Sequence, residues 1–413
     1  MTANPATIVK VGWPAAGSAT ALIGVQTTKA TAGRSSRYDA PTAGTLTVNL
    51  NDPTRRYDPL NSAGPYYGNL KVRRPISLFA RWTNPTGPVI VDVPVWSGYV
   101  DDILTATVPG STSVTITAID LIGLLNFTVS SASSNRPRES CRTRLRWLVS
   151  LLGLTVTEAT VDVGRMLGPM ECADKNVLAL IRGIEIADMG RFQVEPDGAW
   201  SYTSNLKDTV PTIVATGSPN FSSSPAEVPL TSAPMSSALA RYYNSVTASR
   251  LDGLPQTMED SSSFADYGRR SLQPFTELPL AEDSDARDVA NWILLRSSND
   301  VPRPKSATIP LGSILSEARA RGHIADAYSV AVAATAVVAQ SQSSTLSVVT
   351  HYATGSPSSI TTNVIVDKVT HDTAAGRWTA TLDVSPIPSD VGAPMELDNV
   401  TTAVLGTAIL GFT

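Results

Sequence analysis

The residues of this 413-residue chain that could do chemistry are few and scattered. Its three histidines, His323, His351 and His371, stand far apart, whereas a zinc site needs four ligands at suitable spacing. Only His371 has an acidic neighbour, Asp372, and we expect both in a hairpin turn within the segment 367–378. Because neighbours in a strand point to opposite faces, a turn role is favoured over catalysis.

The two cysteines, Cys141 and Cys172, make up neither a disulfide framework nor a metal cluster. Cys141 opens a helical pattern and Cys172 precedes another, so we expect both to be buried free thiols. The signature motifs of serine hydrolases, zinc peptidases and phosphate-binding glycine loops are missing from the sequence. The chain is therefore predicted to be no enzyme, with no catalytic, cofactor-binding or metal-binding residue.

Two groups of acidic residues could bind a metal ion or move a proton. Asp101 and Asp102 could act as an acid/base or metal pair, but we interpret them as a strand end beside solvent. The segments 51–52 and 58–61 contain Asp52 and Asp58, yet they lack the ligand spacing and closing Glu of a calcium loop. Turn capping is the simpler interpretation of these segments.

Five arginines make up the most basic part of the chain: Arg136, Arg138, Arg142, Arg144 and Arg146. Two interpretations are open, because these residues could pair with acids across an interface or mark the solvated start of a helix. Elsewhere there is no run of Lys and Arg, and the formal net charge is −4. Stable nucleic-acid binding therefore has little support.

Charged residues make up only 16% of the chain, whereas soluble domains carry roughly a quarter. The low charge fits a subunit whose flanks are buried by neighbours, and it fits equally a β protein faced with Thr and Ser. The apolar stretches are shorter than the roughly 20 residues that span a bilayer, so no membrane insertion is expected. The N-terminus lacks the pattern of a secretory signal, which predicts synthesis and retention in a cytoplasm.

Apolar and polar side chains alternate along four N-terminal segments, at 44–50, 75–82, 91–100 and 113–119. This is the period of a half-buried strand, and turn-forming clusters separate the segments. Several short strands at such spacing predict a barrel or a sandwich. The strand pattern resumes from residue 307 to 388. Because 365–383 there resembles 99–120, we predict that the two β regions are variations of one barrel.

A helical region separates these two parts. The apolar spacing predicts helices at 143–153 and 177–189, with Asp174 as the N-cap of the second. The segment 190–202 contains Pro-Asp-Gly and predicts a hairpin. Together they predict a compact helix–helix–hairpin unit. A further helix is expected at 283–295, since acidic residues stand in its first turn.

A series of motifs runs through nearly the whole chain. They are Gly33-Arg34, AGTLTVNLNDPTRRYDPLN at 43–61, RPISL at 74–78, WSGYV at 96–100, YNSVTASR at 243–250, YGRRSL at 267–272, a helix pattern at 286–303, and segments at 369–382, 397–398 and 405–412. In this order they resemble the hub-type minor tail proteins of long-tailed phages that infect actinobacteria. The chain departs from the family at its start, where only Trp13 and the segment 25–28 represent an acidic strand.

The resemblance implies a mainly β fold with an α+β insert. Two related β-barrel hub domains and a small helix–helix–hairpin domain are expected. The implied divisions are a first barrel at 1–135, the small domain at 136–210, a second barrel at 211–388 with a helix near 283–298, and a C-terminal extension at 389–413.

The resemblance also implies a structural virion protein, the baseplate hub at the tail tip, assembled in the host cytoplasm. Three copies would form a ring in which six barrels match the sixfold symmetry of the tail tube. The implied partners are the distal tail ring and tail-tube proteins, the C-terminus of the tape-measure protein, and tip fibre or receptor-binding proteins. DNA would only pass through the lumen, so an acidic or neutral lining is expected.

Three rival functions are considered beside the hub. A distal-tail adaptor ring would usually contain six copies. A carbohydrate-binding tail adhesin would be favoured by exposed aromatic residues on one sheet face, and Trp82, Trp96 and Trp200 are the tryptophans to locate. A cell-wall hydrolase fused to a hub is disfavoured, because no appended domain and no catalytic group of residues is found in the sequence.

Overall fold

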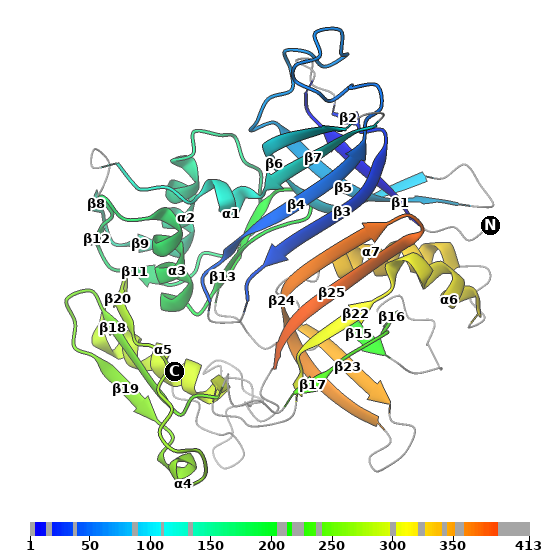
Figure 1. Cartoon of the computed structure of the whole chain (residues 1–413). Coiled ribbons are helices and arrows are strands. Elements are labelled where there is room, and N and C mark those ends of the chain that lie inside the picture. Colours follow the sequence, from blue (N-terminus) through cyan, green and yellow to red (C-terminus); the bar gives the residue numbers. More distant parts are fainter. Residues whose placement is uncertain are drawn as a thin grey trace.

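The computed structural model describes residues 5–13, 19–35, 39–84, 90–108, 111–130, 135–204, 213–216, 227–236, 242–297, 303–320, 327–340, 345–351 and 359–386. Within them the fold is mainly β with an α+β insert, as predicted (Figure 1). One large and mostly antiparallel sheet dominates it. The predictions for His323 and for residues 389–413 lie outside the described residues, as does the side chain of His351.

The N-terminal half of the sheet forms from strands with one covered face. In β4 (Thr42–Asn51), Leu46 and Val48 are buried, while Thr45 and Asn49 are exposed. This alternation with period two is the pattern of a strand that packs on a core with one side only. The other strands of this half are β1 (Ala6–Val11), β2 (Thr20–Ala21), β3 (Val25–Gly33), β5 (Pro75–Thr83), β6 (Ile90–Val108) and β7 (Ser111–Ile119).

The C-terminal half contributes strands to the same sheet: β15 (Ile213–Thr216), β16 (Glu227–Pro229), β22 (Ser306–Ile309), β23 (Thr345–His351), β24 (Ser359–Ala374) and β25 (Arg377–Pro386). The halves join where β24 pairs antiparallel with β3, from Lys368 opposite Gly33 to Thr373 opposite Thr28. The strand order is β16-β15-β23-β24-β3-β4-β7-β6-β5-β1-β2, and β25 also pairs with β24 and β22. In Figure 1 the orange β24 therefore lies beside the blue β3.

The sequence similarity between the two halves has a structural counterpart. β6 and β7 pair antiparallel with a register shift between Val100 and Asp102. β24 and β25 pair in the same way, with a shift between Val366 and Lys368. Such an irregularity bends a strand locally and increases its twist. Both segments of similar sequence thus contain a register shift, as do the pairs β3–β4 and β5–β6, and the division into two barrels remains a prediction.

A helical insert follows β7. It contains α1 (Leu121–Leu124), α2 (Cys141–Ser150), α3 (Val177–Ala187) and the hairpin of β13 (Arg191–Val194) and β14 (Trp200–Thr203), with short strands β8 (Asn135–Arg136), β9 (Glu139–Ser140), β10 (Glu158–Val161), β11 (Met166–Leu167) and β12 (Met170–Glu171). The two predicted helices and the hairpin are confirmed.

The predicted N-cap of α3 was wrong, because Asn176 and not Asp174 accepts the backbone N–H of Ala179. Asp174 lies in a left-handed turn before the helix, at φ 57°.

A second small sheet packs against the insert. It consists of β18 (Ser245–Arg250), β19 (Gln256–Glu259) and β20 (Phe275–Leu278), with η3 (Ser261–Ser263) and α4 (Phe264–Tyr267) between the last two. The following helix, α5 (Asp283–Ser297), confirms the helix predicted near 283–298. Its buried Val289 and Ile293 share one core with Leu145 of α2 and Ile181 of α3. Two short strands, β17 (Met235–Ser236) and β21 (Arg303–Pro304), pair with each other.

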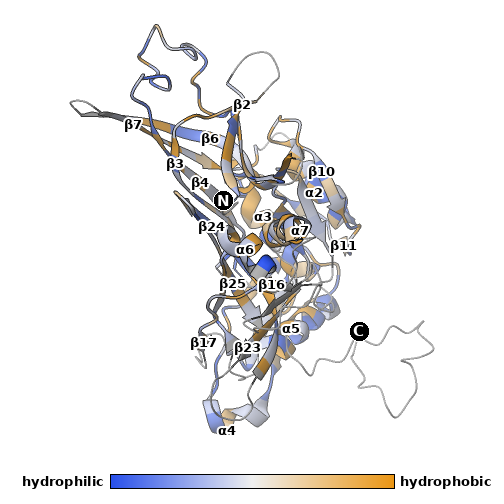
Figure 2. Cartoon of the chain, turned by 90° about the vertical axis from the view of Figure 1, so that its right-hand side faces the viewer, coloured by the Kyte–Doolittle hydropathy of each residue, from blue (hydrophilic) through white to orange (hydrophobic). Residues whose placement is uncertain are grey.

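Among the described residues, helices cover one side of the large sheet and leave its other side bare. In Figure 2 the strands β3, β4, β24 and β25 form the left side of the molecule, and α3 and α7 lie to their right. The last helices are α6 (Ile314–Ala320), which follows η4 (Leu311–Ser313), and α7 (Ala327–Ala339). No helix within the described ranges is long and apolar enough to cross a membrane.

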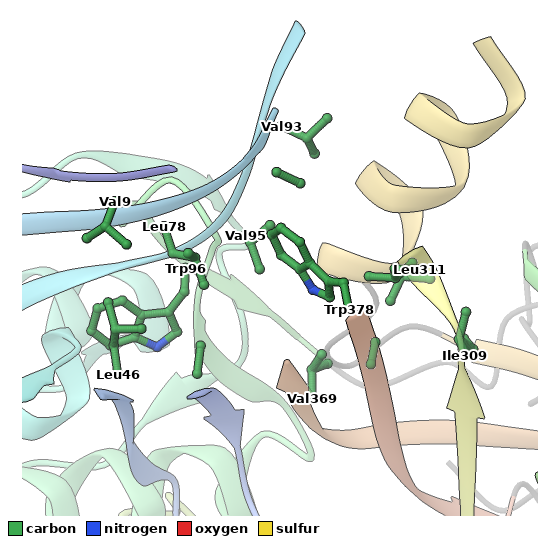
Figure 3. Packing of buried hydrophobic residues seen from close by; sticks show 14 of the residues in the cluster. Val9, Leu46, Leu78, Val93, Val95, Trp96, Ile309, Leu311, Val369 and Trp378 are labelled. Atoms are coloured by element: carbon green, nitrogen blue, oxygen red, sulfur yellow. The ribbon is translucent and has the colours of Figure 1, made fainter. Parts of the chain in front are cut away.

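The core under the sheet draws apolar side chains from both halves of the chain. Figure 3 shows Leu46 and Trp96 from the N-terminal half in the same cluster as Val369 and Trp378 from the C-terminal half. Because one apolar cluster contains side chains from both halves, the two halves pack against each other.

Candidate functional site

His371 lies inside strand β24, so its predicted place in the hairpin turn was wrong. The turn is formed further along the chain, at Ala375 and Gly376. His371 is buried, and its Nδ1 accepts a hydrogen bond from Trp378 Nε1 at 3.3 Å. Burial lowers the pKa of His371 to about 4, because a charged imidazole would lose its hydration. Asp372 is partly exposed on the other face, so the two residues do not act together.

The acidic residues singled out in the sequence are structural. Asp101 and Asp102 are exposed, as predicted. The predicted strand end was wrong, because both residues lie within β6, at its register shift. Asp52 is buried and accepts two backbone N–H groups of the turn that follows it, which confirms turn capping. Asp58 also accepts a backbone N–H and pairs with Arg55. Over the described ranges, no group of three or more His, Cys, Asp or Glu residues could hold a metal ion.

The two cysteines are buried free thiols, as predicted. Burial raises the pKa of Cys141 to about 12, and a negative charge on Asp188 acts in the same direction. Burial also raises the pKa of Cys172. The thiolate is the reactive form of cysteine, so neither residue is prepared for nucleophilic chemistry at neutral pH.

Arginines of the basic cluster bind acidic residues of their own chain. Glu139 is buried and accepts hydrogen bonds from both Arg136 and Arg144, the latter at 3.0 Å. Arg146 pairs with Glu158 on β10. These contacts tie the first turns of α2 to neighbouring strands. Arg136, Arg144 and Arg146 thus pair with acidic residues within the chain, so their charges are neutralised without a subunit interface.

Trp82, Trp96 and Trp200 are all buried, at 1%, 3% and 2% exposure. Trp82 Nε1 donates to the Thr335 hydroxyl of α7 at 3.2 Å, and Trp96 Nε1 donates to the Thr31 carbonyl at 3.1 Å. These tryptophans therefore join layers of the fold, and none of them offers an exposed ring for stacking on a sugar.

The bare side of the large sheet is a surface of threonines, which we call the threonine face. Cross-strand pairing places Thr308, Thr381, Thr370, Thr31 and Thr45 in one row across β22, β25, β24, β3 and β4. A second row contains Thr379, Asp372, Lys29, Thr47 and Thr117, and a third contains Thr27, Asn49 and Thr115. The face crosses the junction between the two halves without a break.

Hydrogen bonds between neighbouring strands hold the side chains of the threonine face in place. The hydroxyl oxygens of Thr31 and Thr45 lie 2.8 Å apart. Asn49 Nδ2 donates to the Thr27 hydroxyl at 2.9 Å, and the Thr115 hydroxyl of β7 donates to Asn49 Oδ1 at 3.0 Å. In the second row Lys29 stands opposite Asp372, and the exposed Asp102 of β6 continues the row opposite Thr117. The result is a polar, nearly neutral surface.

A buried ion pair anchors the insert where the two halves meet. Arg34 follows β3, and its Nη2 donates to Glu185 Oε1 of α3 at 2.7 Å and to the Phe192 carbonyl at 3.2 Å. Gly33 has φ 120°, and a Cβ there would lie 2.2 Å from the Asp367 carbonyl oxygen of β24. Glycine thus permits the close pairing of β3 with β24, and the next residue reaches the insert.

A second buried ion pair lies beside the first. Arg191 of β13 donates to Asp367 Oδ1 at 3.2 Å, and the Ser385 hydroxyl donates to the other oxygen of the same carboxylate. Both ionic side chains are nearly inaccessible, at 2% and 0% exposure. Sequence reasoning missed both pairs, since their partners stand 151 and 176 residues apart. The Gly33-Arg34 motif was the only available signal.

Comparison with known proteins gives the fold a context. No protein-family model matches the chain, and no curated protein matches its sequence. Among solved structures, the chain is similar to the 43 kDa tail protein of prophage MuSo2 from Shewanella oneidensis, with a TM-score of 0.56, 12% identity, and coverage of 92% of this chain and 97% of that chain. The tail protein from Neisseria meningitidis MC58 has a TM-score of 0.56 and 10% identity, with coverage of 92% and 96%. The chain therefore has the fold of these tail proteins.

Proposed function

We propose that this chain is a structural protein of a phage virion, the baseplate hub at the tail tip. In this proposal three copies form a ring that connects the tail tube to the host-binding tip, and DNA passes through its lumen. The chain has no enzymatic role. The tail-protein fold and the collinear motifs of the sequence support this function, and the partly matching halves of the sheet support the ring.

The threonine face is the observation that carries the proposal. It is a wide polar surface built from both halves of the chain, and no described element covers it. Proteins that hold DNA do so mainly with Lys and Arg against phosphates, through release of counterions. A lumen lined with hydroxyl and amide groups and with few cations would hold DNA weakly. Such a lining lets the DNA slide during ejection.

The repeated bulged strand pair supports the symmetry of the ring. Of the bulged pairs in the large sheet, β6–β7 and β24–β25 are the two that lie in the segments of similar sequence, one in each half of the chain. Three copies would therefore present six similar elements to a sixfold tail tube. The proposed neighbours are the distal tail ring and tube proteins on one side and tip fibres or receptor-binding proteins on the other. The C-terminus of the tape-measure protein is the proposed occupant of the lumen before ejection.

The number of copies of this protein in each ring tests the proposal that it is the baseplate hub. Native mass spectrometry of the assembled protein, and symmetry determination on tail tips, should give three copies per ring. Six copies would favour the runner-up, a distal-tail adaptor ring, and a stable monomer within virions would contradict both. The adhesin proposal loses its expected support, because Trp82, Trp96 and Trp200 are buried.

Lysine substitutions test the proposal that the threonine face lines the lumen. Virions that carry Thr31→Lys and Thr47→Lys should eject DNA more slowly, most strongly at low salt, because screening weakens attraction to phosphates. Thr257→Lys is the matched control, since Thr257 is an exposed strand threonine of the second sheet, outside the threonine face. Equal ejection rates for both variants at every salt concentration would rule out the threonine face as the lining.

A further inference from the structure

A pocket of about 840 Å³ lies between α3 and β20. One wall is a single face of α3, because Ala179, Gly183 and Ile186 line the pocket at helical spacing. The Arg182 guanidinium of the same helix lies over the Phe275 ring of β20, 5.9 Å from its centroid. The pocket has the size of a ligand site, and the chemistry of its walls decides which kind of ligand fits.

The opposite wall is the outer strand of the second small sheet. The described strand order of that sheet is β19-β18-β20, so β20 has a partner strand on one side only. All four residues of β20, from Phe275 to Leu278, line the pocket. Because successive side chains of a strand point to opposite faces, a pocket lined by every residue meets the strand along its edge. Such an edge can bind the main chain of an extended peptide, which favours a peptide over a small molecule.

Gly183 leaves the helical wall of the pocket open. Glycine inside a helix is destabilising relative to alanine. A Cβ added at Gly183 would meet only Pro279 Cδ, at 3.5 Å, which is an ordinary van der Waals contact. The packing of the described residues therefore does not require glycine at this position. The missing side chain does allow another backbone to approach α3 closely, as an extended peptide would.

Cationic side chains outnumber acidic ones around the pocket. Lys175, Arg182 and Arg296 line it, against Asp39 and Glu277. Both acidic residues are exposed, so water and salt screen their charges, whereas the three cations are half-buried or buried. Within the described ranges, neither Lys175 nor Arg182 has a salt bridge. Burial lowers the pKa of Arg182, and carboxylates of a ligand would offset this cost of removing its charge from water.

We propose that this pocket binds an extended acidic segment of a partner protein. The main chain of the segment lies along β20, its carboxylates bind Lys175 and Arg182, and its apolar side chains pack on α3. Six extended residues span about 20 Å, so two carboxylates of one short segment can reach two separate cations. This inference does not depend on the proposed function in a tail.

Binding of defined peptides to the full-length protein tests the proposal. The probe is the hexapeptide VELDVE, capped at both ends and carrying a neutral fluorophore, and the controls VKLKVK and VSLSVS keep its apolar residues. Fluorescence anisotropy should show that VELDVE binds at least tenfold more tightly than either control, and less tightly at high salt. Equal binding of VSLSVS would assign the pocket to an apolar partner and overturn the proposal. The absence of VELDVE binding at millimolar concentration would also overturn it.

Charge reversal within the pocket locates the binding site. Arg182→Glu and Lys175→Glu should each weaken the binding of VELDVE at least tenfold. Lys71→Glu makes the same change of charge at an exposed residue that does not line the pocket, and it should leave binding unchanged. Similar binding by Arg182→Glu and the parent protein would show that the peptide binds elsewhere. Loss of hydrogen-exchange protection in β4 marks a misfolded variant, and Arg182→Gln then replaces it in the same comparison.

Native mass spectrometry under the same conditions separates a partner protein from a second copy of this chain. VELDVE should add to the protein without changing the number of chains in each complex. If the peptide instead dissociates oligomers of the protein, a second copy occupies the pocket and the proposal is wrong.

Discussion

Arg34 and Glu185 form a buried ion pair across 151 residues of sequence, with Arg34 Nη2 2.7 Å from Glu185 Oε1. The two side chains are 4% and 2% exposed. The pair connects the end of β3 to α3 at the place where β3 meets β24. It therefore joins the insert to the sheet at the junction of the two halves, and its loss should affect all three parts.

Removal of one charge from this pair should be costly. Glu185→Gln keeps the shape of the side chain and its acceptor for the Phe192 N–H, but leaves Arg34 buried without a counter-charge. We expect a loss of about 3–5 kcal/mol in the free energy of unfolding, measured by denaturant titration. Glu158→Gln breaks the more exposed pair with Arg146 and should cost less than about 1 kcal/mol. Similar losses for the two variants would contradict this account.

Gly33 should tolerate no side chain. Gly33→Ala combines a left-handed backbone with a Cβ 2.2 Å from the Asp367 carbonyl oxygen, so a loss of about 3 kcal/mol or more is expected. Gly376→Ala has a similar backbone, at φ 72°, but its Cβ would meet no atom within 4 Å. That control should cost only about 1–2 kcal/mol. Hydrogen exchange along β24 measures the pairing directly, and equal protection in both variants would show that the close approach is unimportant.

Asp120 should make the protein less stable as pH rises. Burial raises the pKa of Asp120 to about 7, although its carboxylate accepts the Gly123 N–H. Between about pH 4 and pH 7 the native state binds a proton that the unfolded state has lost. The contribution of Asp120 to the free energy of unfolding should therefore fall across this window by up to about 1.4 kcal/mol per pH unit. Asp120→Asn keeps an N-cap acceptor and should remove this slope, as measured by denaturation at pH 4.5 to 7.5.

His371 should have the opposite effect. Its pKa of about 4 in the folded protein lies below the usual 6.5, so the unfolded state binds a proton first. The contribution of His371 to stability is present above pH 6.5 and is lost as pH falls towards 4. His371→Gln should remove this contribution, so the stability of the parent protein relative to the variant should fall as pH falls from 6.5 towards 4. Trp378→Phe removes the donor to Nδ1 and leaves the imidazole, so it should keep the slope. Because Asp120 acts in the opposite direction over the same range, the test is the stability difference between the parent protein and His371→Gln. A difference that stays constant between pH 6.5 and 4 would be inconsistent with a neutral buried histidine.

Local patterns in the sequence were sufficient to predict many elements of this fold. The alternation in β4, the helical spacing of α2 and α3 and the Pro-Asp-Gly hairpin each depend on residues close together in the chain. Errors arose where a strand continued beyond its local signal. His371 was predicted in a hairpin turn within 367–378, yet the pairing of β24 with β3 and β25 keeps His371, Asp372 and Thr373 extended.

The sequence by itself determined a charge-poor, mainly β protein with a helical insert and without recognisable catalytic residues. It also contained every threonine of the threonine face, and in β4, β7 and β25 these threonines stand two positions apart. Only the tertiary structure decided that these strands lie in one sheet, with Thr370 of β24 opposite Thr31 of β3. The order and register of strands depend on contacts between residues hundreds of positions apart, which no local pattern encodes. For the same reason, the sequence alone did not predict Glu185 as the partner of Arg34 or Asp367 as the partner of Arg191.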